Sequence, residues 1–295
     1  MPPYRPISEV AGAQAERVLI LTHGAAEVTA GVMPTVLSIL DAHGVEVLTT
    51  AEEAAKHPPL AERTIIEPTD LRGDRSDLVL VLGGDGSILR ALSRETTTGA
   101  PVLGINFGRV GFLASVEQSN LERGLVRALA GDYITLGLPS LKAEWSEGTL
   151  QAVNDVAFLR SGESRLADLS YSVSGEPVAT VRCDGLICST PVGSTAYNLA
   201  AGGPTVSWRV KCFVLSFIAA HHLDTRPLIL AADEKLTVTN SAIVGDCDVL
   251  ADGVRIAALP PGRSITVGLG GEEVHLAIFP ESSFFRRYRE KFGRS

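Results

Sequence analysis

The stretch Asp77–Leu92, DLVLVLGGDGSILRAL, decides the fold of the first half of the chain. Leu78–Leu82 is a short apolar run, which is typical of a strand buried on both faces. It ends in the glycine-rich segment Gly83–Gly86, and apolar residues then recur at helical spacing from Ile88 onward. The pattern predicts a strand, a glycine turn and a helix, with Ser87 as the helix N-cap.

A strand, a glycine turn and a helix start form a binding site for an anion, because free backbone N–H groups and the helix dipole point at it. Gly83, Gly84 and Gly86 permit positive φ angles and the close approach of a phosphate. The turn is not a Walker A loop, since no Gly-Lys-Ser/Thr follows. The acidic residue, Asp85, suggests a catalytic base or a magnesium contact. The alternative is a tight turn in which Asp85 is a second helix cap.

Composition restricts the class of protein. A chain of 295 residues forms one large or two ordinary domains, and 45% hydrophobic residues suffice for a full core. The net charge of −8 argues against a nucleic-acid binder, which normally carries a basic excess. It does not argue against a nucleotide ligand, since one local site can be positive on an acidic protein.

The four cysteines, Cys183, Cys188, Cys212 and Cys247, form no CxxC pair. They are expected to be small buried residues in a reducing compartment, and neither disulfides nor a zinc site is predicted. The N-terminus does not resemble a signal peptide, and no apolar run reaches the length of a membrane span. We therefore expect a cytoplasmic protein.

The first half alternates between strand and helix patterns after a loose leader over residues 1 to about 15. Strands are predicted at Arg17–Thr22, Val45–Leu48 and Pro101–Ile105, and an apolar stripe from Val28 to Leu40 predicts a helix. The alternation indicates a doubly wound parallel sheet. Ligands bind such sheets at the carboxyl ends of the strands, where the glycine turn and the next turn, residues 106–113, both lie.

That next turn contains Asn106, Phe107, Arg109, Val110 and Phe112 among glycines that do not match the dinucleotide fingerprint GxGxxG. Asn106 is suited to bind a ligand hydroxyl, and either phenylalanine is suited to stack on a base. The alternative is a glycine-rich turn with both phenylalanines in the core.

From Leu141 the pattern changes to ten or more short alternating runs separated by turn residues, which indicates an antiparallel β domain. Pro139 is the expected boundary. The chain ends in FFRRYREKF, Phe284–Phe292, a short basic and aromatic helix.

Two places break the strand pattern. Asn154 and Asp155 interrupt an apolar run, and they offer an amide and a carboxylate to ribose hydroxyls; the alternative is a β-bulge or a turn. The segment Cys183–Pro204 is rich in small residues and contains a predicted helix from Ser194 to Ala201. A flat ligand fits against such a main chain, although a structural loop with a capped helix is the alternative.

Four segments in this order resemble the NAD kinase family: Gly83–Gly86, Asn106 through Leu113, Asn154-Asp155, and Asp184-Gly185 through Gly193-Ser194-Thr195-Ala196-Tyr197 to Pro204. The GSTAY segment is the specific one, because GGDG also occurs in lipid kinases and phosphofructokinases. The resemblance runs from about residue 17 to the end of the chain.

The resemblance implies an α/β domain over residues 1–138 that the tail from about 280 to 295 rejoins, and a β-rich NAD-binding domain over 139–279. It implies transfer of a phosphoryl group from ATP or polyphosphate to the 2′-hydroxyl of the adenosine ribose of NAD, which gives NADP. NAD would bind across the domain interface of a homodimer or homotetramer. A divalent cation, Mg²⁺ or another, would be held mainly by the donor phosphates, without dedicated protein ligands.

The same resemblance implies roles for individual residues. Asp85 would be the general base, which fits a carboxylate within reach of a hydroxyl. Gly83, Gly84 and Gly86 would hold the donor phosphates. NAD would be contacted by Asn106, Phe112, Asn154, Asp155, Asp184, Thr195, Ala196 and Tyr197.

The chain departs from the family at three places. Asp155 replaces a glutamate that is one methylene longer, so we expect its ribose contact to be lost or bridged by water. Residues 205–210 replace a segment that begins with a second proline, and Ala219–Leu223 replaces a Pro-His-Ser-Leu-like segment. Two other functions are therefore kept: a dinucleotide-binding sensor with weak catalysis, and a lipid kinase that shares the GGDG turn.

Overall fold

The computed structural model describes residues 8–66, 76–95, 99–108, 111–162, 166–222 and 224–293, and the side chains of residues 94 and 95 are not part of that description. Arg109, Val110 and Leu223 therefore lie outside the described residues. Two compact units result: Met1–Leu138 with Glu273–Ser295, and Pro139–Glu272. Each unit is described by itself below.

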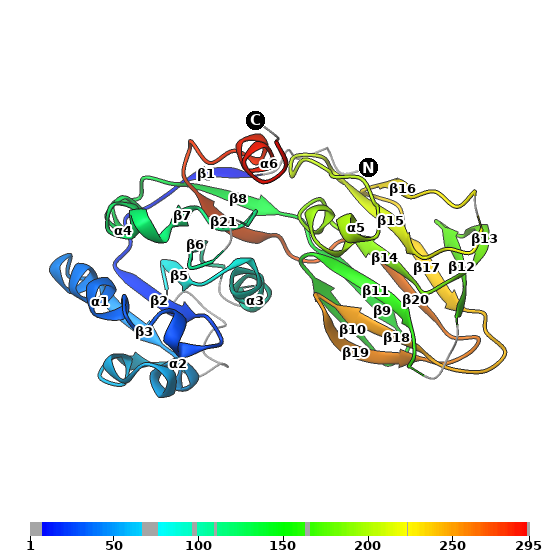
Figure 1. The fold of residues 1–295 in the computed structure, drawn as a ribbon, viewed down its shortest axis with the longest axis horizontal. Helices are drawn as coiled ribbons and strands as arrows, with labels where there is room; N and C mark the ends of the chain where they lie inside the picture. Colours follow the sequence, from blue (N-terminus) through cyan, green and yellow to red (C-terminus); the bar gives the residue numbers. More distant parts are fainter. Residues whose placement is uncertain are drawn as a thin grey trace. The chain divides into compact units, whose positions relative to one another are not determined.

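The first unit is built on a nine-stranded sheet with the order β1-β8-β21-β6-β5-β2-β3-β4, to which β7 adds beside β6 (Figure 1). The pairs from β4 to β21 are parallel, whereas β8 and β1 are antiparallel. Its strands are β1 (Glu9–Ala11), β2 (Arg17–Thr22), β3 (Glu46–Thr49), β4 (Thr64–Ile65), β5 (Leu78–Leu82), β6 (Val102–Asn106), β7 (Val116–Glu117), β8 (Ile134–Leu138) and β21 (Val274–Ile278).

Helices cover both faces of this sheet. They are α1 (Met33–Ala42), α2 (Ala51–Lys56), α3 (Asp85–Glu95), α4 (Leu121–Leu129) and α6 (Phe284–Phe292), with short 3-10 turns at Ala26–Val28, Pro58–Leu60 and Gln118–Asn120. Leu78, Leu80 and Leu82 pack in one cluster with residues of α1 and α4. The alternate residues of β5 point to the opposite face, where α3 packs on β5, β6 and β21. Burial on both faces explains the continuous apolar run.

The second unit consists of two antiparallel six-stranded sheets, β10-β9-β20-β17-β12-β13 and β16-β15-β14-β11-β18-β19. Their strands are β9 (Leu141–Trp145), β10 (Gly148–Ala152), β11 (Asp155–Arg160), β12 (Ala167–Val173), β13 (Glu176–Cys183), β14 (Gly185–Ser189), β15 (Cys212–Ile218), β16 (Leu228–Ala231), β17 (Leu236–Asn240), β18 (Cys247–Ala251), β19 (Val254–Leu259) and β20 (Ser264–Leu269). Inward-facing residues of both sheets form one core around Phe158 and Phe213. A 3-10 turn, Gly193–Thr195, and α5 (Tyr197–Ala200) follow β14.

Two predicted assignments differ from the structure. Val274–Ile278 was placed in the β-rich domain, but as β21 it pairs with β8 and β6 in the first sheet. An isolated apolar strand carries no local signal for the sheet it joins. The predicted leader also contains β1, whose side chains are exposed and whose backbone pairs with β8.

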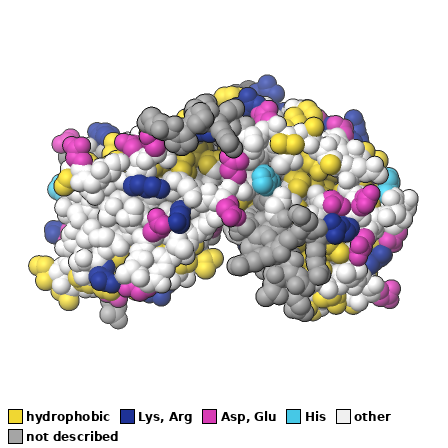
Figure 2. All heavy atoms as spheres, turned by 180° about the vertical axis from the view of Figure 1, so that it is seen from behind, with side chains coloured by type: hydrophobic (Ala, Val, Ile, Leu, Met, Phe, Trp, Pro, Cys, Tyr) yellow, Lys and Arg dark blue, Asp and Glu magenta, His cyan; other side chains and the backbone are white. Residues whose placement is uncertain are grey.

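The surface of the described residues carries charges of both signs. Figure 2 shows Lys and Arg side chains interspersed with Asp and Glu side chains on one face. The four cysteines are buried and unbridged. Along the described part of the chain, no helix has the length and apolar character needed to cross a membrane.

Candidate active site

The glycine turn between β5 and α3 is shorter than predicted. Asp85 is already the first helical residue, so Ser87 lies inside the first turn of α3 and is not its N-cap. Its N–H donates to the Gly84 carbonyl at 2.9 Å. None of Gly83, Gly84 and Gly86 has a positive φ, because the backbone passes from strand to helix without a left-handed residue. The positive φ angles that these glycines permit are not used in this turn.

The three glycines have different surroundings. The N–H of Gly83 donates to the Ile105 carbonyl of β6 at 2.9 Å, and an added Cβ there would overlap Ser87. Beside Gly84 and Gly86, in contrast, the space that a Cβ would occupy is open. Among the described residues, the N–H groups of Gly84 and Gly86 have no hydrogen-bond acceptor. These two glycines have the free amides and the access that a phosphate requires.

Asp85 joins the two glycine-rich turns. Its carboxylate accepts hydrogen bonds from the backbone N–H groups of Phe112 at 2.6 Å and Leu113 at 3.1 Å. A Cβ on Gly111 would overlap this carboxylate, so the close approach requires glycine at that position. The Asp85 side chain therefore binds the backbone of another loop. It does not cap its own helix, which was the alternative prediction.

The second turn begins at Asn106, the last residue of β6. Its side-chain Nδ2 donates to the Gly108 carbonyl at 3.0 Å, and its Oδ1 is buried with no partner among the described residues. Phe112 is 3% exposed, and its ring packs against Phe284 and Phe292 of α6 with centroid distances of 5.9 and 5.7 Å. Phe112 is thus a core residue of the first unit, and its contact with adenine stays a prediction.

In the second unit, Asn154 lies in the bend between β10 and β11. The carboxylate of Asp252 accepts the backbone N–H groups of Val153, Asn154 and Asp155 at 2.9, 2.7 and 3.1 Å. This bend matches the turn that was the alternative to a ligand site. Asn154 Oδ1 is nevertheless buried and has no acceptor or donor partner within the described ranges. It is a candidate acceptor for a ligand N–H or O–H.

Asp155 begins β11 and is 5% exposed. Burial, and secondarily the charge of Asp252, raises the pKa of the Asp155 carboxyl to about 7. Asp184 lies in a different environment, because its carboxylate accepts a hydrogen bond from Arg160 Nε at 3.0 Å and both side chains are half exposed. The two acids predicted to contact NAD thus differ in burial and in pairing.

Buried hydrogen bonds fix the backbone of the GSTAY segment. Ser194 and Asn198 are fully buried; Ser194 Oγ donates to the Pro191 carbonyl at 2.7 Å, and Asn198 Oδ1 accepts from Ser216 Oγ at 2.6 Å. The predicted helix over residues 194–201 is interrupted at Ala196, whose φ of −106° and ψ of −122° are not helical. A 3-10 turn precedes this residue, and only α5 follows it.

The outward side of this segment carries the predicted NAD contacts. Ala196 is exposed, Tyr197 is 39% exposed, and Thr195 Oγ1 donates to the Val192 carbonyl at 3.2 Å. Burial raises the pKa of Tyr197, and the negative charges of Asp155 and Asp184 raise it further. The charges of both acids thus act on Tyr197, although the sequence separates the two acids by 29 residues. Asn154 and Asp155 lie at the Ser189 end of β14, next to Gly193 at the start of the GSTAY segment, whereas Asp184 precedes β14 at its other end.

Sequence reasoning missed two residues that shape these sites. Asp252, which precedes Gly253, is not among the predicted site residues, yet its carboxylate accepts the backbone N–H groups of the Asn154 bend. Arg287 was noted only as part of a basic helix, yet it binds the turn that contacts Asp85. The Asp-Gly dipeptide is a local turn signal, but nothing local identifies either distant partner.

The described residues offer no ready-made metal centre. These residues contain no group of three or more His, Cys, Asp or Glu side chains arranged to hold a metal ion. His221 and His222, adjacent in sequence, are both exposed.

Comparison with known proteins identifies the family. Two family models match the chain: the ATP-NAD kinase N-terminal domain over residues 18–133 and the ATP-NAD kinase C-terminal domain over residues 153–278. An NAD kinase from Symbiobacterium thermophilum is 34% identical over 263 residues, which cover 88% of this chain and 92% of that protein. The chain belongs to the NAD kinase family. Its activity is that of a transferase that phosphorylates NAD.

Solved structures agree with this assignment. An NAD kinase from Archaeoglobus fulgidus in complex with ATP has a TM-score of 0.72 and 26% identity, and the match covers 94% of this chain and 97% of that chain. Yeast NADH kinase complexed with NADH has a TM-score of 0.84 at 24% identity, over 96% of this chain and 89% of that chain, and this likeness shows the shared fold. Neither a lipid kinase nor a non-catalytic sensor is supported by these relatives.

Proposed function

We propose that Asp85 is the general base of this NAD kinase and that it accepts the proton of the 2′-hydroxyl of the adenosine ribose. The observation that carries the proposal is the pair of backbone N–H groups, from Phe112 and Leu113, that fix the Asp85 carboxylate at the start of α3. Each oxygen of a carboxylate has two acceptor positions, so one remains on each oxygen for the hydroxyl. A base fixed in this way needs no reorientation during transfer.

The donor phosphates are proposed to lie against Gly84 and Gly86, whose amides are free and whose surroundings are open. The helix dipole of α3, an 11-residue helix, adds positive potential there. Gly83 was also predicted to bind the donor, but in this structure its N–H is used in the bond to β6. ATP is the donor favoured by the ATP complex of the archaeal relative, and polyphosphate is the second candidate.

The NAD molecule is proposed to be held by residues of the second unit. Asn154 Oδ1 and Asp155 are acceptors for the adenosine part, and Asp184 with Thr195, Ala196 and Tyr197 contacts the nicotinamide part. The support is the buried oxygen of Asn154, which has no partner among the described residues, and the close packing of Gly193, the first residue of the GSTAY segment, against the Asn154 backbone. Asn106 offers a second buried oxygen without a partner among the described residues, and Phe112 is proposed to contact adenine by its edge.

A divalent cation, such as Mg²⁺, is proposed to enter with the donor phosphates. The support is the chemistry of the turn, which offers one carboxylate, Asp85, beside amides that bind phosphate. When bound, the cation would neutralise charge on the transferring group. A cytoplasmic homodimer or homotetramer is proposed from family resemblance.

Purified protein with NAD and Mg²⁺ tests the proposal when ATP and polyphosphate are supplied in parallel. NADP should form with at least one donor, and EDTA should stop its formation until excess Mg²⁺ is added. Absence of NADP with both donors would refute the assigned activity. Activity that is unchanged in EDTA would refute the requirement for a cation.

A further inference from the structure

The C-terminal helix α6 carries a buried charge. Arg287 is 4% exposed, whereas Arg286 and Arg289 on the same helix are exposed. Burial lowers the pKa of Arg287 to about 10, and the nearby Asp85 carboxylate opposes that shift, so the guanidinium stays protonated at neutral pH. A buried cation requires specific partners.

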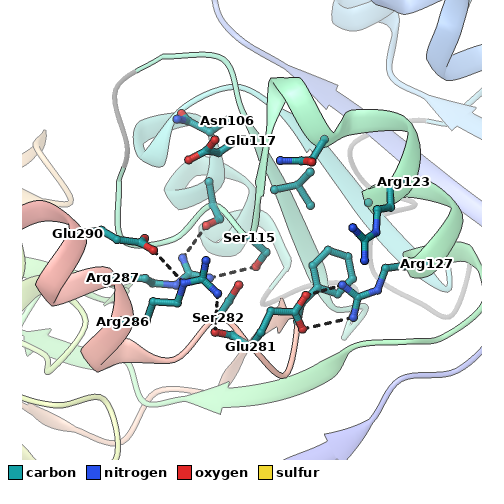
Figure 3. A pocket seen from close by; sticks show the side chains of 15 residues that line it. Asn106, Ser115, Glu117, Arg123, Arg127, Glu281, Ser282, Arg286, Arg287 and Glu290 are labelled. Atoms are coloured by element: carbon teal, nitrogen blue, oxygen red, sulfur yellow. Dashed lines mark hydrogen bonds and ion pairs between the residues drawn. The ribbon is translucent and has the colours of Figure 1, made fainter.

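Three hydrogen-bond acceptors of Arg287 belong to the turn that follows Gly111. Arg287 Nη1 donates to the Phe112 carbonyl and, at 2.6 Å, to the Ala114 carbonyl, and Nη2 donates to Ser115 Oγ at 3.2 Å (Figure 3). Ser115 Oγ in turn donates to the Ala277 carbonyl of β21 at 2.9 Å. The planar guanidinium thus fixes three oxygens of one short loop.

The loop that Arg287 binds also donates hydrogen bonds to the Asp85 carboxylate. Phe112 donates its N–H to the Asp85 carboxylate while its carbonyl accepts from Arg287. Its ring packs against two phenylalanines of α6, Phe284 and Phe292. A continuous set of contacts therefore runs from α6, through the backbone of residues 112–115, to Asp85.

We propose that Arg287 is a positioning residue for phosphoryl transfer, which keeps the Phe112 and Leu113 N–H groups aimed at the Asp85 carboxylate. The proposal rests on the proposed role of Asp85 as the base. It predicts that Arg287 affects the chemical step more than NAD binding, because only Asn106 and Phe112 among the proposed NAD contacts belong to its unit and the others belong to the second unit.

The experiment measures kcat and KM for NAD in Arg287→Ala, Arg287→Lys, Arg286→Ala and Asp85→Asn. Arg287→Ala should lower kcat by about 10- to 100-fold, the size expected when a catalytic group is misplaced by about 1 Å. KM for NAD should stay within about twofold. Arg287→Lys should be intermediate, since lysine supplies the charge without the fork of donors. Arg286→Ala, which removes an exposed pair with Glu290, is the matched control and should resemble the wild type.

Chemical rescue separates positioning from folding. Arg287 lines a cavity of about 360 Å³, so added guanidinium can reach the space that Arg287→Ala vacates (Figure 3). Millimolar guanidinium should raise kcat of Arg287→Ala and leave Arg286→Ala unchanged. If Arg287→Ala does not fold, Arg287→Lys tests the proposal instead. A lowered kcat with an unchanged KM for NAD would support the positioning role of Arg287, and a wild-type kcat would contradict it.

The outcomes distinguish the two proposals. Wild-type kcat in folded Arg287→Ala, with an inactive Asp85→Asn, would overturn the role of Arg287 and leave the base in place. A raised KM for NAD without a change in kcat would also overturn it. Full activity of Asp85→Asn would instead refute the proposed base itself.

Discussion

Both units place an aspartate directly after a backbone bend, but they use its carboxylate differently. In the first unit Asp85 starts α3 and binds the N–H groups of Phe112 and Leu113. In the second unit Asp155 starts β11, and Asp252 binds the amides of the bend instead. Within the described residues, no hydrogen-bond donor reaches the Asp155 carboxylate, which is buried.

The difference teaches what each carboxylate can do. Amide donors stabilise a charged carboxylate and fix its direction, which suits a base that must meet one hydroxyl. A buried carboxylate without donors is costly when charged, and ligand hydroxyls would supply the missing hydrogen bonds. This contrast supports the proposal that Asp85 serves the chemical step and Asp155 serves ligand binding.

The largest expected effect on stability concerns Asp155. Its folded pKa is raised from 3.8 to about 7, so the folded state resists ionisation that the unfolded state undergoes. Stability is thus lost as the pH rises from about 4 to 7, and the loss is constant above that range. Asp155→Asn should remove this loss of stability, because asparagine does not ionise. The variant should stabilise the second unit by on the order of 3 kcal/mol at pH 8, with little effect at pH 4.

Urea unfolding followed by tryptophan fluorescence checks this prediction, because both tryptophans, Trp145 and Trp208, lie in the second unit. Asp248→Asn is the control, since its carboxylate already has a donor in Arg255 at 2.8 Å. It should not gain stability toward high pH. An Asp155→Asn gain that is equal at pH 4 and pH 8 would contradict the account.

A smaller loss is expected when the bend in the second unit loses its acceptor. Asp252→Ala leaves the N–H groups of Val153, Asn154 and Asp155 without their carboxylate. We expect the free energy of unfolding of the second unit to fall by about 2 kcal/mol and KM for NAD to rise. Asp168→Ala, which breaks an exposed pair with Arg182, should cost less than about 1 kcal/mol. Equal losses in the two variants would show that Asp252 does not hold the bend.

The smallest effect tests the close approach of the two turns in the first unit. Gly111→Ala places a methyl group where the Asp85 carboxylate lies, so the carboxylate must shift. We expect kcat to fall by about 10-fold, which corresponds to about 1.4 kcal/mol in the barrier. Gly108→Ala meets open space and should stay within about twofold of the wild type. Steady-state NADP formation gives kcat for both variants. Equal kcat values would contradict the close approach of the Asp85 carboxylate to Gly111.

Local sequence patterns predicted the elements around the active site well. The apolar run Leu78–Leu82 is β5, and the glycines after it do lead directly into α3. The helix start was predicted three residues late, at Ile88 and not at Asp85, because Ser87 is a good capping residue by type and the two-residue turn has no signature of its own. The family relationship, predicted from four short segments, is confirmed.

Local sequence patterns could not predict the long-range contacts that orient the site residues. Asp252 lies 97 residues from Asp155, and Arg287 lies 175 residues from Phe112. Partners at such separations are chosen by the topology of the sheets. For the same reason the sequence did not place β21 in the first sheet, where it carries the chain back toward α6.

The most direct test of the central claim is a side-by-side steady-state analysis of Asp85→Asn and Asp155→Asn with NAD as the varied substrate. Asp85→Asn should lose about 1,000-fold in kcat with nearly unchanged KM, as removal of a general base predicts. Asp155→Asn should retain most of kcat and show a raised KM for NAD. The opposite pattern, or wild-type kcat in Asp85→Asn, would contradict the assignment of the chemical step to the GGDG turn.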